Sequence, residues 1–220
     1  MIAKNEAENI GRCIRSVLDY VDEIIVVDTG STDNTITIAQ SLGAEVYQEN
    51  WQDDFSFHRN TSLKKATGDW ILYLDCDEEL AISSESKLKT TINGNTAFEA
   101  YYVQIVNQLD NGSEMTFSSV RLFKNRKCFR FSGQIHEQIV NSIVENYGTK
   151  SIGHSDIKFI HHGYNMKSVN IREKIKQKLE ILKKYPASKK NGFYFYNLGT
   201  EYLRLGKRKN IMKALYKGLI

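Results

Sequence analysis

The chain has 220 residues, of which 41% are hydrophobic and 25% charged, a composition typical of a globular protein and not of a disordered or fibrous one. Its longest aliphatic run, over 24–27, is far shorter than the roughly 20 residues that cross a bilayer, so we expect no transmembrane helix. The first residues become polar at Lys4 and lack the apolar stretch of a secretory signal. Three cysteines without a C-x-x-C spacing support neither a disulfide framework nor a zinc site. We therefore expect a cytoplasmic protein.

The net charge of +4 is distributed unevenly along the chain. Residues 1–165 carry 15 Lys and Arg against 23 Asp and Glu, a net of −8, whereas residues 166–220 carry 15 against 3, a net of +12. This contrast predicts two different regions with a boundary near 165. The basic region is either a set of solvated helix faces or a surface for an anionic partner, such as an acidic membrane surface or a phosphorylated acceptor. No nucleic-acid motif accompanies the charge, so we expect no nucleic-acid partner.

The first 80 residues alternate between helical and strand patterns. We expect helices over 7–19, 33–42 and 57–66, and strands over 23–27, 44–47 and 70–74. The run over 70–74 is apolar on both faces, and such strands separated by helices indicate a parallel sheet that is covered on both sides. The sequence therefore predicts a Rossmann-like α/β domain, whose ligands bind at the carboxyl ends of the strands.

After residue 95 the alternation of strands and helices is lost. Strand-like runs over 100–106 and 116–123 predict a smaller mixed sheet that forms the far wall of a cleft. From 165 onward the pattern is helical, with an apolar stripe that Pro186 ends; the stripe consists of Ile171, Ile175, Leu179 and Leu182. The spacing over 195–206 matches the opening of a tetratricopeptide repeat, a unit that must pack on neighbours to bury its apolar face.

Acidic side chains stand where two of the expected strands end. Asp28 follows the strand over 23–27, and Asp75 and Asp77 follow the strand over 70–74. Two neighbouring carboxylates repel each other unless a cation lies between them, and Mg or Mn suits oxygen ligands and completes its shell with substrate phosphates and water. D-x-D alone occurs by chance in solvated acidic turns, but its position after a buried strand favours a metal site.

Four segments resemble, in order and spacing, the family 2 glycosyltransferases of GT-A fold. These segments are M-I-A-K-N-E over 1–6, V-V-D-T-G-S-T-D over 26–33, D-F-S-x-x-R-N over 54–60 and G-D-W-I-L-Y-L-D-C-D-E over 68–78. Further along, G-x-I-H-E over 133–137 and I-H-H-G-Y over 160–164 resemble the subgroup in which this domain precedes tetratricopeptide repeats. That subgroup includes peptide S-glycosyltransferases and cell-surface sugar transferases.

The resemblance implies a GT-A domain over 1–165 followed by a basic helical extension over 166–220. It also implies inverting transfer of a sugar from a nucleotide diphosphate donor, for which we expect a UDP sugar and a Mn or Mg ion. The acceptor is a glycan, a lipid-linked saccharide or a peptide, and neither the sugar nor the oligomeric state follows from the sequence.

The family pattern gives each candidate residue a role on the donor side. Asp28 would bind the nucleoside, although it could equally cap the following turn. Arg59 would hold the donor with its planar guanidinium, unless it forms a surface ion pair. Asp75 would reach toward the ribose and the metal, and Asp77 would be the direct metal ligand. His161 is the candidate third ligand, with a purely structural histidine as the alternative.

Inverting transfer also needs a base that removes the acceptor proton. Glu137 is the first candidate and His136 the second, because they form the His-Glu dipeptide of the G-x-I-H-E segment. The alternative is a pair that only orders this loop. Cys76 lies between the two metal-ligand candidates, but alternation along a strand turns its side chain away from them and into the core.

Two departures from the family pattern bear on these expectations. Only residues 1–3 precede the K-N-E motif, so we expect a central sheet without most of its first strand, and the repeat region ends after one helix pair. A non-catalytic helical-repeat binding module on a truncated glycosyltransferase is therefore one alternative. A nucleotidyltransferase is another, but it would need a glycine-rich phosphate loop with Lys or Arg near the N-terminus, which the sequence lacks.

Overall fold

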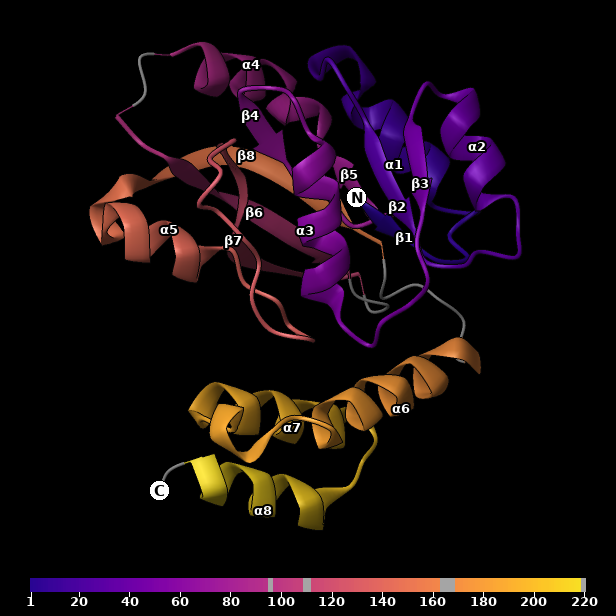
Figure 1. Ribbon diagram of the computed structural model, residues 1–220, viewed down its shortest axis with the longest axis vertical. Coiled ribbons are helices and arrows are strands. Elements are labelled where there is room, and N and C mark those ends of the chain that lie inside the picture. The colour runs from indigo at the N-terminus through magenta and orange to yellow at the C-terminus, as the bar shows by residue number, and fades with distance from the viewer. Residues whose placement is uncertain (95–96, 109–111, 163–168, 219–220) are drawn as a thin grey trace. The chain divides into compact units, whose positions relative to one another are not determined.

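The computed structural model describes residues 1–94, 97–108, 112–162 and 169–218 (Figure 1). The chain forms two compact units. The sheet unit comprises Met1–Gln52, Ser56–Ser132 and Gln138–Asn165, and the helical unit comprises Asp53–Phe55, Gly133–Glu137 and Met166–Ile220. Two short loops from the first two thirds of the chain, Asp53–Phe55 and Gly133–Glu137, thus belong to the helical unit.

The sheet unit begins with three parallel strands in the order β1-β2-β3. These are β1 (Ile2–Ala3), β2 (Ile25–Asp28) and β3 (Glu45–Gln48), and they alternate with α1 (Ile10–Val17) and α2 (Thr35–Ser41). Every residue of β2 is buried, as the parallel-sheet prediction requires of a central strand. In α1 the buried Ile10, Cys13, Ile14 and Val17 recur at helical spacing, which directs one face of the helix into the core.

The Asp33 side chain lies at the start of α2. The helix expected to follow Thr32 or Asp33 is α2, which begins at Thr35, and Asp33 Oδ1 accepts a hydrogen bond from Thr35 N at 3.0 Å. Asp33 Oδ2 accepts a second hydrogen bond from Ala7 N at 3.2 Å. One carboxylate therefore orders both the start of α2 and the loop that follows β1.

The second sheet is mixed and has the strand order β4-β7-β6-β8-β5. Its strands are β4 (Trp70–Leu72), β5 (Glu78–Leu80), β6 (Ala100–Gln108), β7 (Glu114–Lys124) and β8 (Ile152–His161). The assignment of 70–74 to a parallel sheet is wrong, because β4 pairs antiparallel with β7. Its two faces are covered as predicted, since Trp70 and Leu72 pack on one apolar cluster and Ile71 on another, but cover on both faces does not fix the direction of a neighbouring strand.

Among the described strands and α-helices of the sheet unit, four have no counterpart among the expected elements. They are β5, β8, α4 (Glu85–Asn93) and α5 (Val140–Tyr147). In β8 the buried Ile157 and Phe159 alternate with exposed or half-buried neighbours such as Lys158. This strand pairs parallel with β6 and antiparallel with β5, so it joins the acidic segment after β4 to the rest of the sheet. The helix expected over 57–66 is α3 (Phe55–Lys65).

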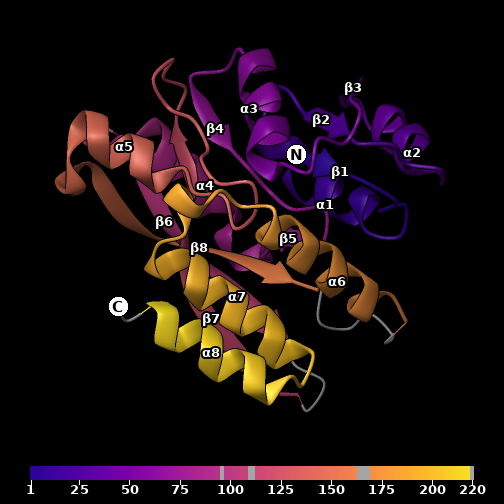
Figure 2. The same cartoon turned by 60° about the horizontal axis from the view of Figure 1, so that its bottom comes forward.

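The helical unit contains α6 (Val169–Lys183), α7 (Gly192–Arg204) and α8 (Arg208–Gly218). Ile175, Leu179 and Leu182 of the predicted stripe on α6 are buried, whereas the side chain of Ile171 lies outside the described residues. Asn191 caps α7 by accepting a hydrogen bond from Tyr194 N. α7 and α8 lie side by side in both views (Figures 1 and 2), as expected of two helices joined by a short loop. Within the described part of the chain, no helix is both long and apolar enough to cross a membrane.

Candidate active site

The pairing of β5 with β8 brings together predicted residues that are far apart in the sequence. We call residues 75–79 with His161 and His162 the acidic corner. Glu78 stands opposite His161 in the strand register. Beside it, Asp77 Oδ2 lies 3.2 Å from His161 Nε2, and Glu79 Oε2 lies 2.9 Å from His162 Nε2. The structure thus places the candidate ligands Asp77 and His161 in direct contact.

A buried amide fixes the orientation of the His161 ring. His161 Nδ1 lies 2.6 Å from Oδ1 of Asn107, a residue of β6 that is 2% exposed. An amide oxygen can only accept a hydrogen bond, so Nδ1 carries the hydrogen and Nε2 faces Asp77. Burial lowers the pKa of His161, but the hydrogen bond and charge of Asp77 outweigh burial and raise it. A proton or a metal ion between Nε2 and the carboxylate would stabilise this arrangement.

The chemistry and spacing of Asp77 and His161 suit a divalent metal. Two ligands that a six-coordinate ion holds at right angles, each about 2.1 Å away, lie about 3 Å apart, close to the 3.2 Å between Asp77 Oδ2 and His161 Nε2. The described residues contain no group of three His, Cys, Asp or Glu side chains that could hold a metal. An ion bound here would therefore take most of its ligands from substrate phosphates and water, as Mg commonly does.

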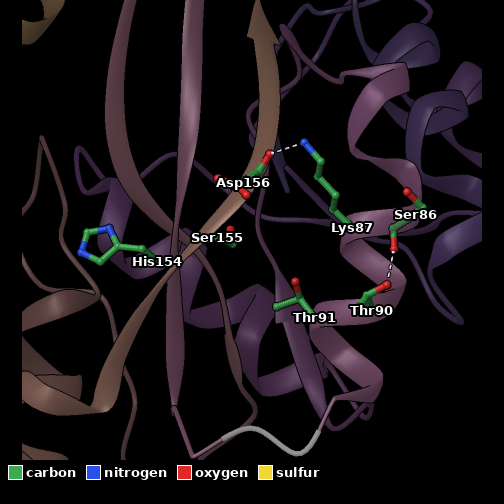
Figure 3. Close-up of a pocket in the computed structure, with 7 residues that line it drawn as sticks. All are labelled: Ser86, Lys87, Thr90, Thr91, His154, Ser155 and Asp156. Atoms are coloured by element: carbon green, nitrogen blue, oxygen red, sulfur yellow. Dashed lines mark hydrogen bonds between the residues drawn. The ribbon is translucent and has the colours of Figure 1, made fainter.

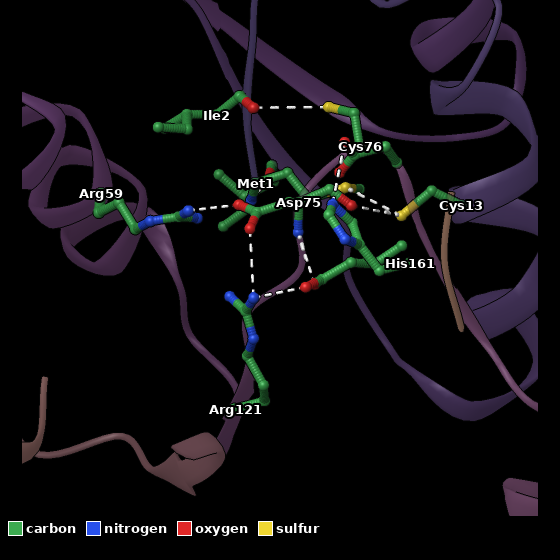
Figure 4. Close-up of polar contacts among 11 residues, drawn as sticks. Met1, Ile2, Cys13, Arg59, Asp75, Cys76, Arg121 and His161 are labelled. Atoms are coloured by element: carbon green, nitrogen blue, oxygen red, sulfur yellow. Dashed lines mark hydrogen bonds and ion pairs between the residues drawn. The ribbon is translucent and has the colours of Figure 1, made fainter. Parts of the chain in front are cut away.

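Asp75 is clamped by two arginines from different elements (Figure 4). Its Oδ1 accepts a hydrogen bond from Arg59 Nη2 of α3, and its Oδ2 accepts one from Arg121 Nη2 of β7 at 3.2 Å. Burial would raise the pKa of Asp75, but the two guanidinium charges hold it well below its usual range. Both guanidiniums also contact the ring of Tyr73, with Cζ 4.8 Å (Arg59) and 4.3 Å (Arg121) from its centroid. Arg59 therefore forms an ion pair in which its own side chain is 7% exposed and that of Asp75 is 37% exposed, and its role in holding the donor stays a prediction.

Arg121 and Glu78 are two site residues that were not predicted from the sequence. Glu78 is 2% exposed; its Oε1 accepts a hydrogen bond from Arg121 Nη2, and its Oε2 accepts one from Asp75 N at 3.0 Å. Burial raises the pKa of Glu78 to about 7, although the Arg121 charge opposes this shift. Arg121 could have been found from its position inside the apolar run Val120 to Phe123. An unpaired charge there would be costly, so the position indicates a buried acidic partner.

Asp28 organises the loop that follows β2. It is 1% exposed, its Oδ1 accepts hydrogen bonds from Gly30 N and Ser31 N at 3.0 and 2.8 Å, and its Oδ2 accepts one from Ser31 Oγ. Asn5 ties the preceding K-N-E segment to this loop, because its Oδ1 accepts a hydrogen bond from Thr32 N at 2.8 Å. These contacts are those of a turn cap, and a role of Asp28 in nucleoside binding stays a prediction.

His136 and Glu137, the two candidates for the base, lie in the helical unit. Their loop begins at Gly133, whose φ of 103° favours glycine, and His136 also has a positive φ, 54°. Gln134 O accepts a hydrogen bond from Phe55 N at 2.8 Å. His136 Nε2 lies 3.6 Å from Glu201 Oε1 of α7. The loop is therefore attached to other parts of the helical unit at Gln134, before the His-Glu dipeptide, and at His136 itself.

Two further features stand apart from these residues. Cys76 is 5% exposed and packs in the apolar cluster that includes Ala3 and Val26, which confirms its predicted place in the core. A pocket of about 380 Å³ lies between α4 and β8 (Figure 3). Its lining consists of Ser86, Lys87, Thr90, Thr91, His154, Ser155 and Asp156. None of the predicted site residues lines it.

Comparison with known proteins identifies the family. Residues 1–144 match the family described as glycosyl transferase family 2. A TPR repeat-containing protein of Synechococcus elongatus is 41% identical over 145 residues, which are 66% of this chain and 35% of that protein. The SPbeta prophage-derived glycosyltransferase SunS of Bacillus subtilis is 28% identical over 225 residues, which cover 100% of this chain and 52% of SunS. The chain thus spans about half the length, or less, of these relatives.

Solved structures agree on the fold. TarS residues 1–349 of S. aureus superpose with a TM-score of 0.58 at 12% identity, covering 98% of this chain and 88% of that one. Glucosyl-3-phosphoglycerate synthase of Mycobacterium tuberculosis in complex with Mn²⁺ and UDP-glucose superposes with a TM-score of 0.56 at 17% identity, covering 82% and 74%. The predicted α/β GT-A-like fold with C-terminal helices is confirmed, and the chain belongs to glycosyl transferase family 2.

Proposed function

We propose that the chain is the catalytic part of an inverting, metal-dependent glycosyltransferase that uses a UDP sugar. The contact between Asp77 and His161 carries the proposal, because a carboxylate and an imidazole 3.2 Å apart could both be ligands of one divalent ion. The complex of the mycobacterial synthase with Mn²⁺ and UDP-glucose supports the choice of metal and nucleotide by analogy of fold.

Each candidate residue takes one part of the transfer. Asp77 and His161 would hold Mn or Mg, which when bound neutralises charge on the leaving diphosphate. Asp75 would reach toward the ribose of the donor, with its charge and orientation set by Arg59 and Arg121. Glu137 removes the proton from the acceptor nucleophile as that atom attacks the anomeric carbon in line, and the UDP leaves from the opposite face of the sugar.

The helical unit supports a proposal about the acceptor. The TPR repeat-containing relative and the α7–α8 helix pair favour the repeat-bearing subgroup of the family. Residues 166–220, with a net charge of +12, would attract an anionic acceptor or an anionic membrane surface that presents one. We propose a glycan, a lipid-linked saccharide or a peptide as the acceptor.

A nucleotide-sugar hydrolysis screen tests this function without knowledge of the acceptor. The full chain is incubated with UDP-glucose and then other nucleotide sugars, with Mn²⁺ or with a chelator, and nucleotide release is measured. We expect UDP release that requires Mn²⁺ and that falls at least about 10²-fold in Asp77→Asn. Asp156→Asn, which removes an exposed carboxylate from β8, serves as the matched control. Full activity of Asp77→Asn, or full activity in chelator, would contradict the metal-dependent mechanism.

A further inference from the structure

A buried carboxylate of the helical unit plays no part in the acidic corner. Glu201 of α7 is 1% exposed, and its two oxygens face His136 Nε2 at 3.6 Å and Arg204 Nη1 at 3.5 Å. Burial alone would raise the pKa of Glu201, but pairing with His136 and the charges of Lys178 and Arg204 lower it. Glu201 is therefore an ionised group that is buried against the His-Glu loop, where an unpaired charge would be costly.

A second polar contact anchors the residue before His136. Tyr185, which follows α6, accepts a hydrogen bond at its Oη from Ile135 N at 3.3 Å. Ile135 is itself 4% exposed. Two consecutive loop residues, Ile135 and His136, are thus attached to the end of α6 and to α7.

The backbone of the loop needs such attachment. His136 has a φ of 54°, a left-handed conformation that costs a residue with a Cβ energy and persists only where surrounding contacts enforce it. The backbone conformation of His136 sets the direction in which the side chain of the next residue, Glu137, points. Contacts that hold His136 therefore also orient Glu137.

We infer that Glu201 and Tyr185 are positioning residues, through which the C-terminal helices hold the G-x-I-H-E loop in its reactive conformation. The inference rests on the proposed function, in which Glu137 is the base. It gives α6 and α7 a role in the transfer step itself, beyond the attraction of an acceptor. Since a misplacement of about 1 Å can cost 10²-fold in rate, two polar contacts can control the reactivity of Glu137.

The test compares rate, binding and local opening in variants of the full chain. Steady-state kinetics of Mn²⁺-dependent UDP release from UDP-glucose give kcat and KM, calorimetry gives the Kd of UDP, and hydrogen exchange follows the amides of 133–137. Glu201→Ala removes the pairing, whereas Glu201→Gln keeps an oxygen that can accept a hydrogen bond from the imidazole. Glu180→Gln removes an exposed carboxylate of α6 and is the matched control.

We expect Glu201→Ala to lower kcat about 10- to 100-fold with KM and the Kd of UDP unchanged. Glu201→Gln should recover most of this loss, and Glu180→Gln should behave as the wild type. Exchange of 133–137 should be faster in Glu201→Ala, while β6 exchanges as before. Tyr185→Phe, which removes a single oxygen and keeps the ring packing, should lower kcat about 3- to 10-fold even if Glu201→Ala fails to fold.

The outcomes separate this inference from the proposed function. Unchanged exchange of 133–137 in both Glu201→Ala and Tyr185→Phe overturns the inference, whatever the activity. Wild-type kcat in both variants beside an inactive Glu137→Gln also overturns it and leaves the base assignment standing. Normal turnover of Glu137→Gln contradicts the base assignment itself.

Discussion

The acidic corner and the 133–137 loop carry the side chains for which we propose roles in metal binding and catalysis, but different interactions hold the two regions in place. In the corner, the register of β5 on β8 places Glu78 opposite His161, and Arg59 and Arg121 pair with Asp75. The loop has an isolated bridge at its base between Ser132 and Gln138, and its contacts include those with Phe55, Tyr185 and Glu201 of the helical unit.

This difference has consequences for substitutions in the two regions. Slippage of a strand register by one residue would turn every side chain to the other face, so the backbone positions of the corner residues depend on the stability of the sheet. Because polar contacts of single residues hold the loop, we expect that it can lose its conformation while both units stay folded. We therefore expect corner variants to affect stability and metal binding, and loop variants to affect turnover.

The largest effect is expected at the loop, from Glu137→Gln. The amide cannot accept the acceptor proton, so turnover should fall about 10²- to 10⁴-fold while the affinity for UDP stays nearly unchanged. UDP release and calorimetry measure the two quantities, and Glu145→Gln on the exposed face of α5 is the control. Normal turnover of Glu137→Gln beside an inactive His136→Ala would move the base to the histidine.

The largest effect on stability is expected in the corner, from Arg121→Met. This change leaves the Glu78 carboxylate, which is 2% exposed, without its guanidinium partner. Loss of one partner of a buried ion pair costs about 3–5 kcal/mol in the free energy of unfolding. Urea unfolding measures the loss, and Arg130→Met at an exposed position is the control.

The double variant Arg121→Met with Glu78→Gln tests the cause of that loss. Since the amide carries no charge, the double variant should be more stable than Arg121→Met alone. If the two variants unfold at the same urea concentration, the unpaired charge of Glu78 is not the source of the destabilisation.

Sequence patterns predicted the parts of the molecule that local periodicity determines. The alternation of helices and strands through β3 was predicted to within a few residues, because each element shows its own apolar spacing. The family motifs located Asp77 and His161, which the structure then brought into contact.

Parts that depend on contacts between distant residues were not predicted. The direction of β4, the pairing of β5 with β8 and the arginine clamp on Asp75 all depend on β7 or β8, which follow Asp75 by more than 35 residues. Membership of the 133–137 loop in the helical unit depends on Tyr185 and Glu201, neither of which has a motif of its own.

A smaller effect is expected when the ring orientation of His161 is disturbed. Asn107→Ala removes the oxygen 2.6 Å from His161 Nδ1, so the ring is no longer fixed with Nε2 toward Asp77. Loss of such a supporting hydrogen bond typically weakens metal affinity 10- to 100-fold. Mn²⁺ binding in the presence of UDP measures the effect, with Asn146→Ala on α5 as the control. An unchanged Mn²⁺ affinity would argue against His161 as a ligand.

The smallest effect is expected from Lys184→Gln, although Lys184 also contacts a loop of the helical unit, Asp53–Phe55. Lys184 Nζ lies 2.5 Å from Asp53 Oδ2, but the two side chains are 61% and 43% exposed. Water and salt screen such a pair, so its removal should leave both the melting temperature and the kcat of UDP release unchanged within error. Glu201→Ala breaks an ion pair in the same unit whose carboxylate is 1% exposed, and it should lower kcat. If Lys184→Gln lowers kcat as much as Glu201→Ala does, exposed contacts matter for turnover as much as buried ones. The burial of Glu201 would then not explain its effect on the 133–137 loop.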